Sequence, residues 1–487
     1  MIHDLEAHDS EPTSLGAGHY AIAIIGGGFS GSMLAVELLR RAKGSLALVL
    51  IERRPIPGRG VAYGTQFEGH LLNVRAKNMS AYAGVPDHFV KWAQHHYSPS
   101  VKPDDFLPRT VYGQYVSSQL RETTSRYPGK LRCIQSEAVS LEHIDGRAQI
   151  QMANGEIVGA DYIVLALGNF PPGDLRLPGK ELSSRRFVSD PWSRDALVDT
   201  AQESSILLIG SGLTSVDVTL DLRARGFDGV IHVLSRRGLL PQRHAAIPFP
   251  PFRVGLAPTT IRELLRMVRV LIRQAQARGS NWREVIDSLR PVTQQIWRTL
   301  PLVEQRRFLR HLRTYWDVHR HRIAERIADQ LALELRNGQM QMHSGRIMEY
   351  KESVDGVGIT YRDRNGGDLI TLRVDRVVNC TGPECDCRRT SSALLSDLIR
   401  KGVARPDELS LGLGVSDDGA VLDAQGVPSE FLYALGPLRR GKLWESVAVP
   451  ELRVQVAALA KLLAKAASSE EGAALSKNEE LLTPIHG

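Results

Sequence analysis

Two glycine-rich turns, each directly after a short apolar run, constrain the fold of this chain more than any other feature. The first follows residues 20–25 and the second follows residues 206–209, and together they carry Gly26, Gly28, Gly31, Gly210, Gly212 and Ser215. A strand that enters a helix through such a turn lets backbone N–H groups approach a pyrophosphate, whose charge the positive end of the helix dipole stabilises. The pair therefore predicts an α/β protein with two dinucleotide-binding (Rossmann-like) domains.

The ends of the next strands predict which nucleotide each unit binds. Glu52 closes the apolar run 46–51, where a carboxylate accepts hydrogen bonds from a ribose diol and repels a 2′-phosphate. Arg236 and Arg237 follow the run 230–234, where guanidinium groups favour a 2′-phosphate, with a solvated strand end as the alternative. These residues predict FAD or NAD in the first unit and NADPH in the second. Such a pair is typical of an enzyme that passes hydride from a nicotinamide to a bound flavin.

Two further apolar strands and the C-terminal part of the chain set the expected domain boundaries. Residues 161–168 and 375–382 each run from an aspartate through six residues to a glycine, and Gly168 and Gly382 let the chain turn where the lobes connect. Two ordinary buried strands are the alternative. Proline at a first helical position predicts a last helix near Pro450. We expect a flexible N-terminus (1–19), a discontinuous FAD-binding domain (20–190 and 345–465), an NADPH-binding domain (191–344) with a helical insertion (256–337), and a disordered tail rich in Ala, Ser, Glu and Lys (466–487).

Composition and charge exclude several other classes of protein. With 487 residues, of which 43% are hydrophobic and 24% charged, the chain resembles a soluble globular protein of two or three domains. Its net charge of +7 is mild, so we expect no nucleic-acid partner, and no segment predicts a membrane span or signal peptide. The four cysteines form no CxxC motif, which favours a reducing cytoplasm and disfavours a disulfide reductase. His319 and His321 lie two apart without a completing ligand, so we expect no metal site.

The predicted helical insertion has one basic face. Thr260 and Glu263 have the spacing of a capping box at the start of an amphipathic helix. The face opposite its apolar residues carries Arg262, Arg266, Arg269 and Arg273. A solvated face is the simpler interpretation of this basic stripe, and a partner or lid role is the alternative.

Five longer segments carry a resemblance to a known family: residues 58–65, 70–74, 108–115, 315–322 and 435–446. On these segments the chain resembles the FAD/NAD(P)-binding proteins that include FAD-dependent urate hydroxylase and L-aspartate N-hydroxylase. These proteins are distant relatives of flavin-containing and N-hydroxylating monooxygenases. The resemblance implies a single-component monooxygenase that uses NADPH, FAD and molecular oxygen and forms a flavin C4a-hydroperoxide. The implied substrate is small, anionic and nitrogen-containing, such as a urate-like heterocycle or an amino acid.

Catalytic and substrate-binding residues follow partly from the resemblance and partly from spacing. Asn73 is similar to a family position that places an amide near the flavin edge, with a turn cap as the alternative. Arg109, Tyr112 and Tyr115 are spaced to share one helical face, where they could line the FAD crevice or bind an anionic substrate; a surface helix start is the alternative. The segment 315–322 could form a structural corner or contact substrate.

The last resembling segment adds Gly436 and Trp444 to the predicted cofactor-binding residues. The chain departs from the family pattern at two places. Pro437 follows Gly436 where the broader flavoprotein pattern has an aspartate, so backbone groups must replace that carboxylate. Arg75 stands where the family often has proline, which adds a positive charge for an anion.

Two other functions stay open at this point. One is a plain FAD-dependent NAD(P)H reductase that hands electrons to a quinone or a protein. The other is a non-catalytic flavin or nucleotide sensor whose helical insertion binds protein or RNA, supported only by the basic stripe.

Overall fold

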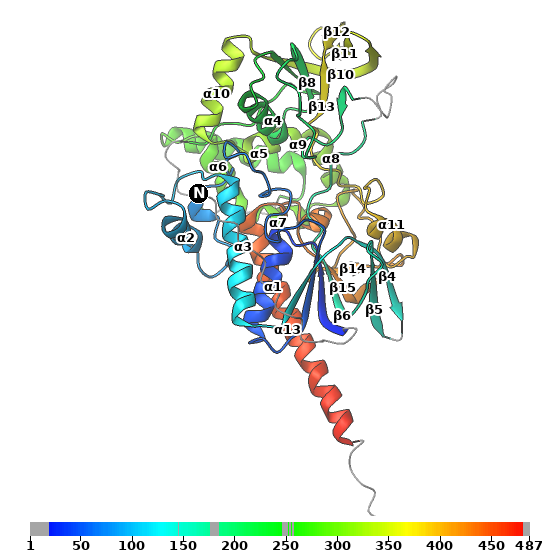
Figure 1. The fold of residues 1–487 in the computed structure, drawn as a ribbon. Coiled ribbons are helices and arrows are strands. Elements are labelled where there is room, and N and C mark those ends of the chain that lie inside the picture. The colour runs from blue at the N-terminus through cyan, green and yellow to red at the C-terminus, as the bar shows by residue number, and fades with distance from the viewer. Residues whose placement is uncertain are drawn as a thin grey trace, which may run out of the picture.

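The chain forms two lobes, each built around its own β-sheet, with a layer of helices between them (Figure 1). The structure is a computed structural model and describes residues 19–144, 146–175, 185–245, 252, 255 and 258–480. The expected flexible N-terminus lies outside the described residues except for His19. The two sheets confirm the predicted α/β class with two dinucleotide-binding folds.

The first sheet has eight strands and brings the two ends of the chain together. Its main path runs β14-β15-β6-β1-β2-β3, and the β4–β5 hairpin joins it through β6. The strands are β1 (His19–Ile25), β2 (Leu48–Glu52), β3 (Leu131–Gln135), β4 (Ala138–Ile144), β5 (Arg147–Met152), β6 (Ile157–Leu165), β14 (Ala420–Leu422) and β15 (Pro428–Ala434). Because β1 is parallel to both β2 and β6, three strands end at the same edge, which is where nucleotides bind in such folds.

Alternating side chains of β1 give the first lobe two cores. Ile22 and Ile24 face one core, while Ala23 and Ile25 face the other. The first core is covered by α1 (Phe29–Arg41), η1 (Ala76–Asn78), α2 (His88–His96), α3 (Arg109–Arg126) and α13 (Val449–Glu480). The second core lies under the β4–β5 hairpin and α11 (Ala393–Arg400). This sandwich fixes β1 and the turn that follows it.

The second sheet has seven strands in the order β12-β11-β10-β9-β8-β13-β7. They are β7 (Phe187–Val188), β8 (Ser205–Ile209), β9 (Val230–Ser235), β10 (Met340–Ser353), β11 (Gly356–Asp363), β12 (Leu369–Val374) and β13 (Arg376–Asn379). One face is covered by α4 (Leu213–Ala224) and α10 (Glu325–Arg336).

The predicted boundaries of the FAD-binding domain are wrong at two places. Residues 345–379 and 187–188 lie in the second sheet, because β10 pairs with β9 and β13 pairs in parallel with both β8 and β7. The chain returns to the first lobe only after Asn379. The strands β10 to β12 carry no nucleotide signature, and their place depends on long-range pairing that a local pattern does not encode.

The helical layer is formed by α5 (Ile261–Ala277), α6 (Trp282–Leu289), η2 (Arg290–Val292), α7 (Thr293–Thr299), α8 (Leu302–His311) and α9 (Arg313–Arg320). The predicted capping box is confirmed, since Thr260 and Glu263 exchange hydrogen bonds at the start of α5. The apolar face of α5 packs into a cluster that includes Trp444. The four arginines of the basic stripe are exposed and border an open groove between α5 and α8.

Helix α13 projects from the body of the molecule at its C-terminal end (Figure 1). It continues to Glu480, so residues 466–480, which we predicted to be part of a disordered tail, are helical. Ala, Glu and Lys are strong helix formers, and this preference outweighs the polar composition on which the prediction rested. Within the described ranges, no helix is both long enough and apolar enough to span a bilayer.

Candidate dinucleotide sites

The first glycine turn joins β1 to α1 and leaves no room for a side chain at Gly26 or Gly31. Gly26 has a φ of +103°, and a Cβ there would lie 2.4 Å from the carbonyl oxygen of Ala166. A Cβ on Gly31 would lie 1.9 Å from the carbonyl oxygen of Gly26. Gly28 is the N-cap of α1 and lines an adjoining cleft. The turn therefore presents backbone at a helix N-terminus to this cleft, as phosphate binding requires.

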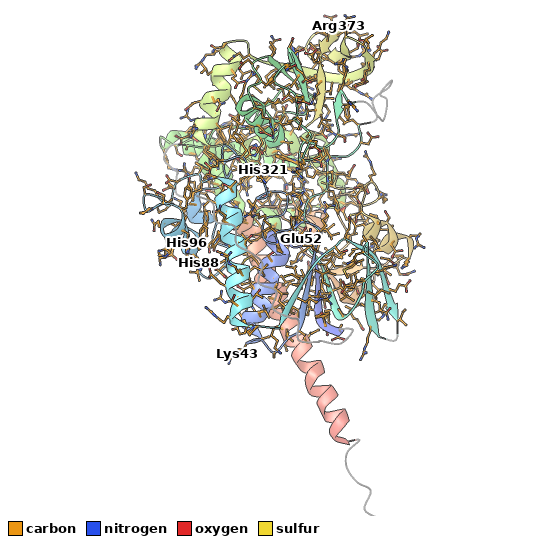
Figure 2. The ribbon with its side chains drawn as sticks, viewed as in Figure 1. Lys43, Glu52, His88, His96, His321 and Arg373 are labelled. Atoms are coloured by element: carbon orange, nitrogen blue, oxygen red, sulfur yellow. The ribbon has the colours of Figure 1, made fainter. Side chains whose placement is uncertain are left out.

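The carboxylate of Glu52 is fixed beside this turn at the end of β2. Its Oε2 accepts a hydrogen bond from the Gly27 N–H at 2.6 Å, and its Oε1 accepts one from the Arg54 N–H at 2.8 Å. The side chain is only 9% exposed, yet it lines the cleft. Figure 2 places Glu52 near the middle of the molecule, below the level of His321. Two backbone donors thus orient this carboxylate toward the cleft.

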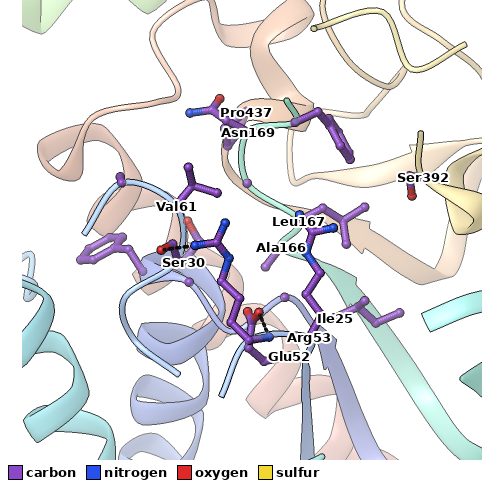
Figure 3. A pocket seen from close by; sticks show the side chains of 18 of the residues that line it. Ile25, Ser30, Glu52, Arg53, Val61, Ala166, Leu167, Asn169, Ser392 and Pro437 are labelled. Carbon is purple, nitrogen blue, oxygen red and sulfur yellow. Dashed lines mark hydrogen bonds between the residues drawn. The ribbon is translucent and has the colours of Figure 1, made fainter. Parts of the chain in front are cut away.

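The cleft has a volume of about 1210 Å³, part of it open to solvent. Figure 3 shows Glu52 and Arg53 at one end of it and Asn169 and Pro437 at the other. Arg54 and Arg59 add further positive charge, and the Nε of Arg59 is buried without a hydrogen-bond partner. Buried donors are normally paired, so an unpartnered guanidinium N–H beside a phosphate-binding turn fits a bound anion.

Gly168, the residue after Gly436 and the last helix complete the cleft. Gly168 follows β6 with a φ of +69° and lines it directly. Gly436 follows β15 with a φ of +71°, and its N–H donates to Oε1 of Gln455 at 3.2 Å. The helices η3 (Gly436–Arg439) and α12 (Arg440–Leu443) come next. Because Leu452 in the first turn of α13 lines the cleft, the positive end of that helix faces it.

The second glycine turn joins β8 to α4 and is built differently. Gly210 has a φ of +109°, and a Cβ there would lie 2.4 Å from the carbonyl oxygen of Cys380. A Cβ on Gly212, the N-cap of α4, would meet no atom within 4 Å, so this side of the turn is open. Ser215 is buried, and its Oγ donates to the carbonyl oxygen of Gly212 at 2.8 Å. Gly382, with a φ of +86°, follows the neighbouring strand β13.

Two arginines follow β9 beside this turn, and among the described residues only one of them has a hydrogen-bond partner. Arg236 is exposed. Arg237 donates to the hydroxyl of Tyr315 at 3.0 Å, and its guanidinium lies 4.8 Å from the centre of that ring. The two predicted phosphate-binding arginines therefore differ, since only Arg236 lacks a partner within the described part of the chain.

Arg109 does not act as a free cation at a helix start or in the cleft. Its guanidinium forms a two-point ion pair with Asp217 of α4, with Nη1 to Oδ2 at 2.7 Å and Nη2 to Oδ1 at 3.0 Å. Its Nε donates to the carbonyl oxygen of Leu71 at 3.0 Å, and Nε2 of His70 lies 3.1 Å from the carbonyl oxygen of Asp217. Arg109 therefore makes a contact that joins the two lobes, and its catalytic role stays a prediction. Sequence spacing missed this contact because Asp217 lies in a distant segment.

Asn73 also lies where the lobes meet. Its backbone carbonyl accepts a hydrogen bond from Nε2 of His244 at 3.1 Å. Burial and the nearby Arg322 lower the pKa of His244 to about 3, so this ring is neutral at ordinary pH. Within the described residues, the side-chain amide of Asn73 has no hydrogen-bond partner. Arg75, the departure noted above, donates to the carbonyl oxygen of Ala245 at 2.5 Å.

Tyr112 and Tyr115 lie in the core of the first lobe and not on a polar helical face. Both side chains are fully buried, and their rings pack with those of Phe89 and Tyr63. Burial raises the pKa of both phenols. Their three-residue spacing correctly predicted that they share one helical face. The face is apolar because both rings pack against other aromatic side chains in the core.

Trp444, predicted to contact the cofactor, is not among the residues that line the cleft. It is 4% exposed and stacks on Trp297 with ring centres 5.0 Å apart. Its backbone has φ +59° and ψ −66°, and the Glu445 N–H donates to the Leu443 carbonyl oxygen at 2.7 Å. This is a strained γ-turn. It places the indole in the helical layer and sends the next side chain, Glu445, inward.

Glu445 anchors a buried ionic network that the sequence did not reveal. It accepts hydrogen bonds from Nε1 of Trp316 at 3.0 Å and from Arg320 at 3.3 Å. Arg320 and Arg290 also pair with Glu451, at 3.5 and 2.7 Å. Burial raises the pKa of Glu445, but Arg320 and other nearby donors outweigh it and hold the pKa below its usual value. The segment 315–322 therefore forms a structural corner that ties the helical layer to the start of α13.

The sequence and the fold match known flavoproteins. Residues 23–170 match the family described as FAD-NAD(P)-binding, a range that contains the first glycine turn, Glu52 and Gly168. No curated protein sequence matches the chain significantly.

Three solved structures illustrate the likeness in fold, and each is aligned with 92% of this chain. The ornithine N-hydroxylase of Kutzneria sp. 744, with reduced FAD, NADP⁺ and L-ornithine, has 15% identity, 99% coverage of its chain and a TM-score of 0.61. The L-lysine 6-monooxygenase of Pseudomonas syringae has 15% identity, 100% coverage and a TM-score of 0.64. The bacillithiol disulfide reductase of Bacillus cereus has 16% identity, 99% coverage and a TM-score of 0.53. At such identities the likeness shows a shared two-domain fold.

Proposed function

We propose that this protein is a cytoplasmic, FAD- and NADPH-dependent monooxygenase that hydroxylates a small, anionic, nitrogen-containing substrate with molecular oxygen. The observation that carries the proposal is the pair of unlike dinucleotide turns in one chain. The first has a fixed carboxylate at the next strand end, and the second has a serine followed by an exposed arginine. The fold shared with ornithine and lysine N-hydroxylating enzymes supports oxygenation. A urate-like heterocycle or an amino acid is the proposed substrate class.

In this proposal the first cleft holds FAD. Glu52 would bind a ribose diol, the backbone at Gly26 and Gly28 would approach the pyrophosphate, and Arg59 would supply its unpartnered N–H groups to the same anion. When bound, FAD supplies the redox chemistry that side chains lack, by accepting hydride from NADPH and activating oxygen. The amide of Asn73 stays our proposed contact near the flavin edge.

The second turn would hold NADPH against the first lobe. Gly212 and the start of α4 would face the pyrophosphate, and Arg236 would bind the 2′-phosphate. The ion pair between Arg109 and Asp217 fixes α4 to the first lobe only two residues after Ser215. These contacts would hold the second turn at a fixed place relative to the first lobe, so we assign them a positional role.

A substrate screen tests this proposal. Purified protein is given NADPH and a panel of small anionic amino acids and purines, with NADPH oxidation, product mass and hydrogen peroxide measured together. A monooxygenase gives substrate-dependent NADPH oxidation, a product heavier by one oxygen atom and little peroxide. If NADPH oxidation responds only to a quinone or a disulfide and no oxygenated product forms, the protein is a reductase. If NADPH is not consumed under any condition, the sensor hypothesis takes its place.

A further inference from the structure

Among the described residues, two arginines have a buried Nε and no oxygen partner for any N–H group of the guanidinium. The side chains whose Nε is buried and unpaired are those of Arg59, Arg320, Arg322, Arg376, Arg439 and Arg440. Three of them satisfy the guanidinium through ion pairs with carboxylates, and Arg439 donates to the carbonyl oxygen of Asp417 at 2.8 Å. Within the described ranges, Arg59 and Arg440 have no such partner. Arg59 lines the cleft assigned to FAD, so Arg440 is the one that the proposed cofactors leave unexplained.

Arg440 sits in an electropositive, partly open corner between the helical layer and the first lobe. Its guanidinium lies 4.7 Å from the centre of the Trp444 ring, and its Nη1 contacts Sγ of Cys385 at 3.6 Å. Arg313 approaches the same indole at 6.0 Å. Burial and the charge of Arg440 lower the pKa of Arg313, which indicates crowded positive charge. Asp317 lies within ion-pair distance of Arg313 at 3.5 Å. The Asp407 carboxylate packs against Gly441 and accepts from the backbone N–H groups of Leu409 and Leu411, and no carboxylate of the described residues forms an ion pair with Arg440.

Arg440 lies close to the cleft along the chain. Arg440 begins α12 directly after η3, and Pro437 of η3 lines the cleft. The stacked indole of Trp444 holds the guanidinium from one side. Cys385 is partly exposed, and its contact with the Pro383 carbonyl is at the surface, so a small molecule can reach the corner.

We propose that Arg440, supported by Trp444 and flanked by Arg313, is an anion-binding residue that receives the carboxylate or equivalent anionic group of the substrate. A planar guanidinium binds a carboxylate through two parallel hydrogen bonds, and the burial of the Arg440 Nε strengthens the bond that this N–H donates. The substrate role rests on the proposed function, whereas anion binding at Arg440 does not.

Cys385 offers a direct probe of anion binding, because its thiol lies beside Arg440. Full-length protein is alkylated with iodoacetate, which carries a carboxylate, and separately with neutral iodoacetamide, and the rate at each cysteine is measured by peptide mass spectrometry. The ratio of the two rates cancels any difference in thiol reactivity, since both reagents attack the same thiolate. Cys133 is exposed and serves as the internal control, and the other two cysteines are buried.

The proposal predicts that the iodoacetate-to-iodoacetamide ratio at Cys385 exceeds the ratio at Cys133 by about tenfold. Arg440→Gln lowers the ratio at Cys385 to that at Cys133, and Arg440→Lys leaves an intermediate value. The wild-type excess also shrinks as salt rises. Equal ratios at the two cysteines of the wild-type protein, or a ratio at Cys385 that Arg440→Gln leaves unchanged, overturn the proposal.

This experiment separates the inference from the proposed function. The ratios are measured without NADPH or substrate, so they test anion binding at Arg440 independently of any oxygenation. If the ratios confirm anion binding while the substrate screen gives no oxygenated product, the site stands and its substrate belongs to another reaction.

Discussion

The two glycine turns share one local design but differ at the third small residue. In the first turn the Cα of Gly31 packs so closely on the carbonyl oxygen of Gly26 that no side chain fits. In the second turn Ser215 fills the corresponding place, and its hydroxyl donates to the carbonyl oxygen of Gly212 at 2.8 Å. The first turn is therefore closed against its helix by contact, and the second is held by a hydrogen bond.

The strand ends beside the turns differ more. Glu52 accepts a hydrogen bond from a backbone N–H of the first turn at 2.6 Å and lines the first cleft. Ser235 stands at the end of β9, where its Oγ lies 2.8 Å from the Oγ of Ser211 and accepts from the Gly238 N–H at 3.0 Å. A cleft with a ribose acceptor suits a resident cofactor, and an open turn without an acid suits a coenzyme that binds and leaves in each cycle. We infer that the residue at the strand end, Glu52 in the first lobe and Ser235 in the second, separates the site of a resident cofactor from that of an exchanging coenzyme.

The largest expected effect comes from closing the first turn with a methyl group. Gly31→Ala puts a Cβ 1.9 Å from the Gly26 carbonyl oxygen, and the backbone on both sides cannot yield. We expect loss of bound flavin and a destabilisation of at least about 3 kcal/mol. Flavin absorbance per chain and thermal unfolding measure both. The matched change in the second turn, Ser215→Ala, keeps full flavin content and costs about 1 kcal/mol. Equal losses in the two variants would remove the distinction between the turns.

The next effect comes from separating the lobes that carry the turns. Arg109→Ala leaves Asp217 buried and uncompensated, which costs about 3 kcal/mol or more. The double variant Arg109→Ala/Asp217→Ala regains part of that loss, because both charges are gone. Denaturant unfolding of the single and double variants measures the coupling. Strict additivity of the two single changes would show that the ion pair does not join the lobes.

Removing the charge of Glu52 tests the first strand end. Glu52→Gln weakens two hydrogen bonds from backbone N–H groups and one proposed contact with ribose. We expect FAD affinity to fall about 30-fold, or about 2 kcal/mol, by titration of apoprotein with FAD. Ser235→Ala in the second lobe serves as the control and leaves FAD affinity unchanged. An unchanged affinity in the Glu52 variant contradicts its assignment.

Arg236 tests the second strand end. Arg236→Ala should raise the KM for NADPH about tenfold more than the KM for NADH, because only NADPH carries the 2′-phosphate. Arg237→Ala should have a smaller effect, since Tyr315 already holds that guanidinium at 3.0 Å. Steady-state kinetics with both coenzymes gives the comparison. Equal changes for NADPH and NADH in the Arg236 variant would exclude the 2′-phosphate role.

The smallest expected effect is a loss of stability in mild acid. The pKa of His244 falls from 6.5 in the unfolded chain to about 3 in the folded protein, so the unfolded state binds more protons between these values. Stability therefore decreases as the pH falls below 6.5, by roughly 1 kcal/mol near pH 6. Denaturant unfolding at pH 8 and pH 6 shows a smaller loss in His244→Gln than in the wild type. The rest of the loss comes from other histidines whose pKa burial lowers, namely His88, His232, His321 and His343. The same pH dependence in both proteins would exclude His244 as its source.

Local pattern was sufficient for the parts of the site that lie within one strand-turn-helix unit. Gly26, Gly28, Glu52 and Gly168 were predicted from spacing along the chain, and all of them line one cleft. Each works through its own backbone conformation or its place at a strand end, which a short segment encodes.

Contacts between distant segments were not predictable in the same way. Arg109 was interpreted as a free cation because its partner, Asp217, lies in the other lobe. The strands β10 to β12 were assigned to the wrong lobe because their pairing with β9 joins segments far apart in the sequence. The orientations of Trp444 and Glu445 depend on a γ-turn that the sequence pattern does not predict. The apolar character of the face shared by Tyr112 and Tyr115 could have been recognised from their neighbours.

We propose above all that the first cleft binds FAD tightly while the second turn binds NADPH transiently. The most direct measurement is the visible spectrum of the purified protein after extensive dialysis, with released flavin identified by chromatography and NADP⁺ assayed in the same sample. The account predicts stoichiometric FAD, a yellow protein and no retained NADP⁺. A colourless protein that also fails to take up added FAD contradicts it.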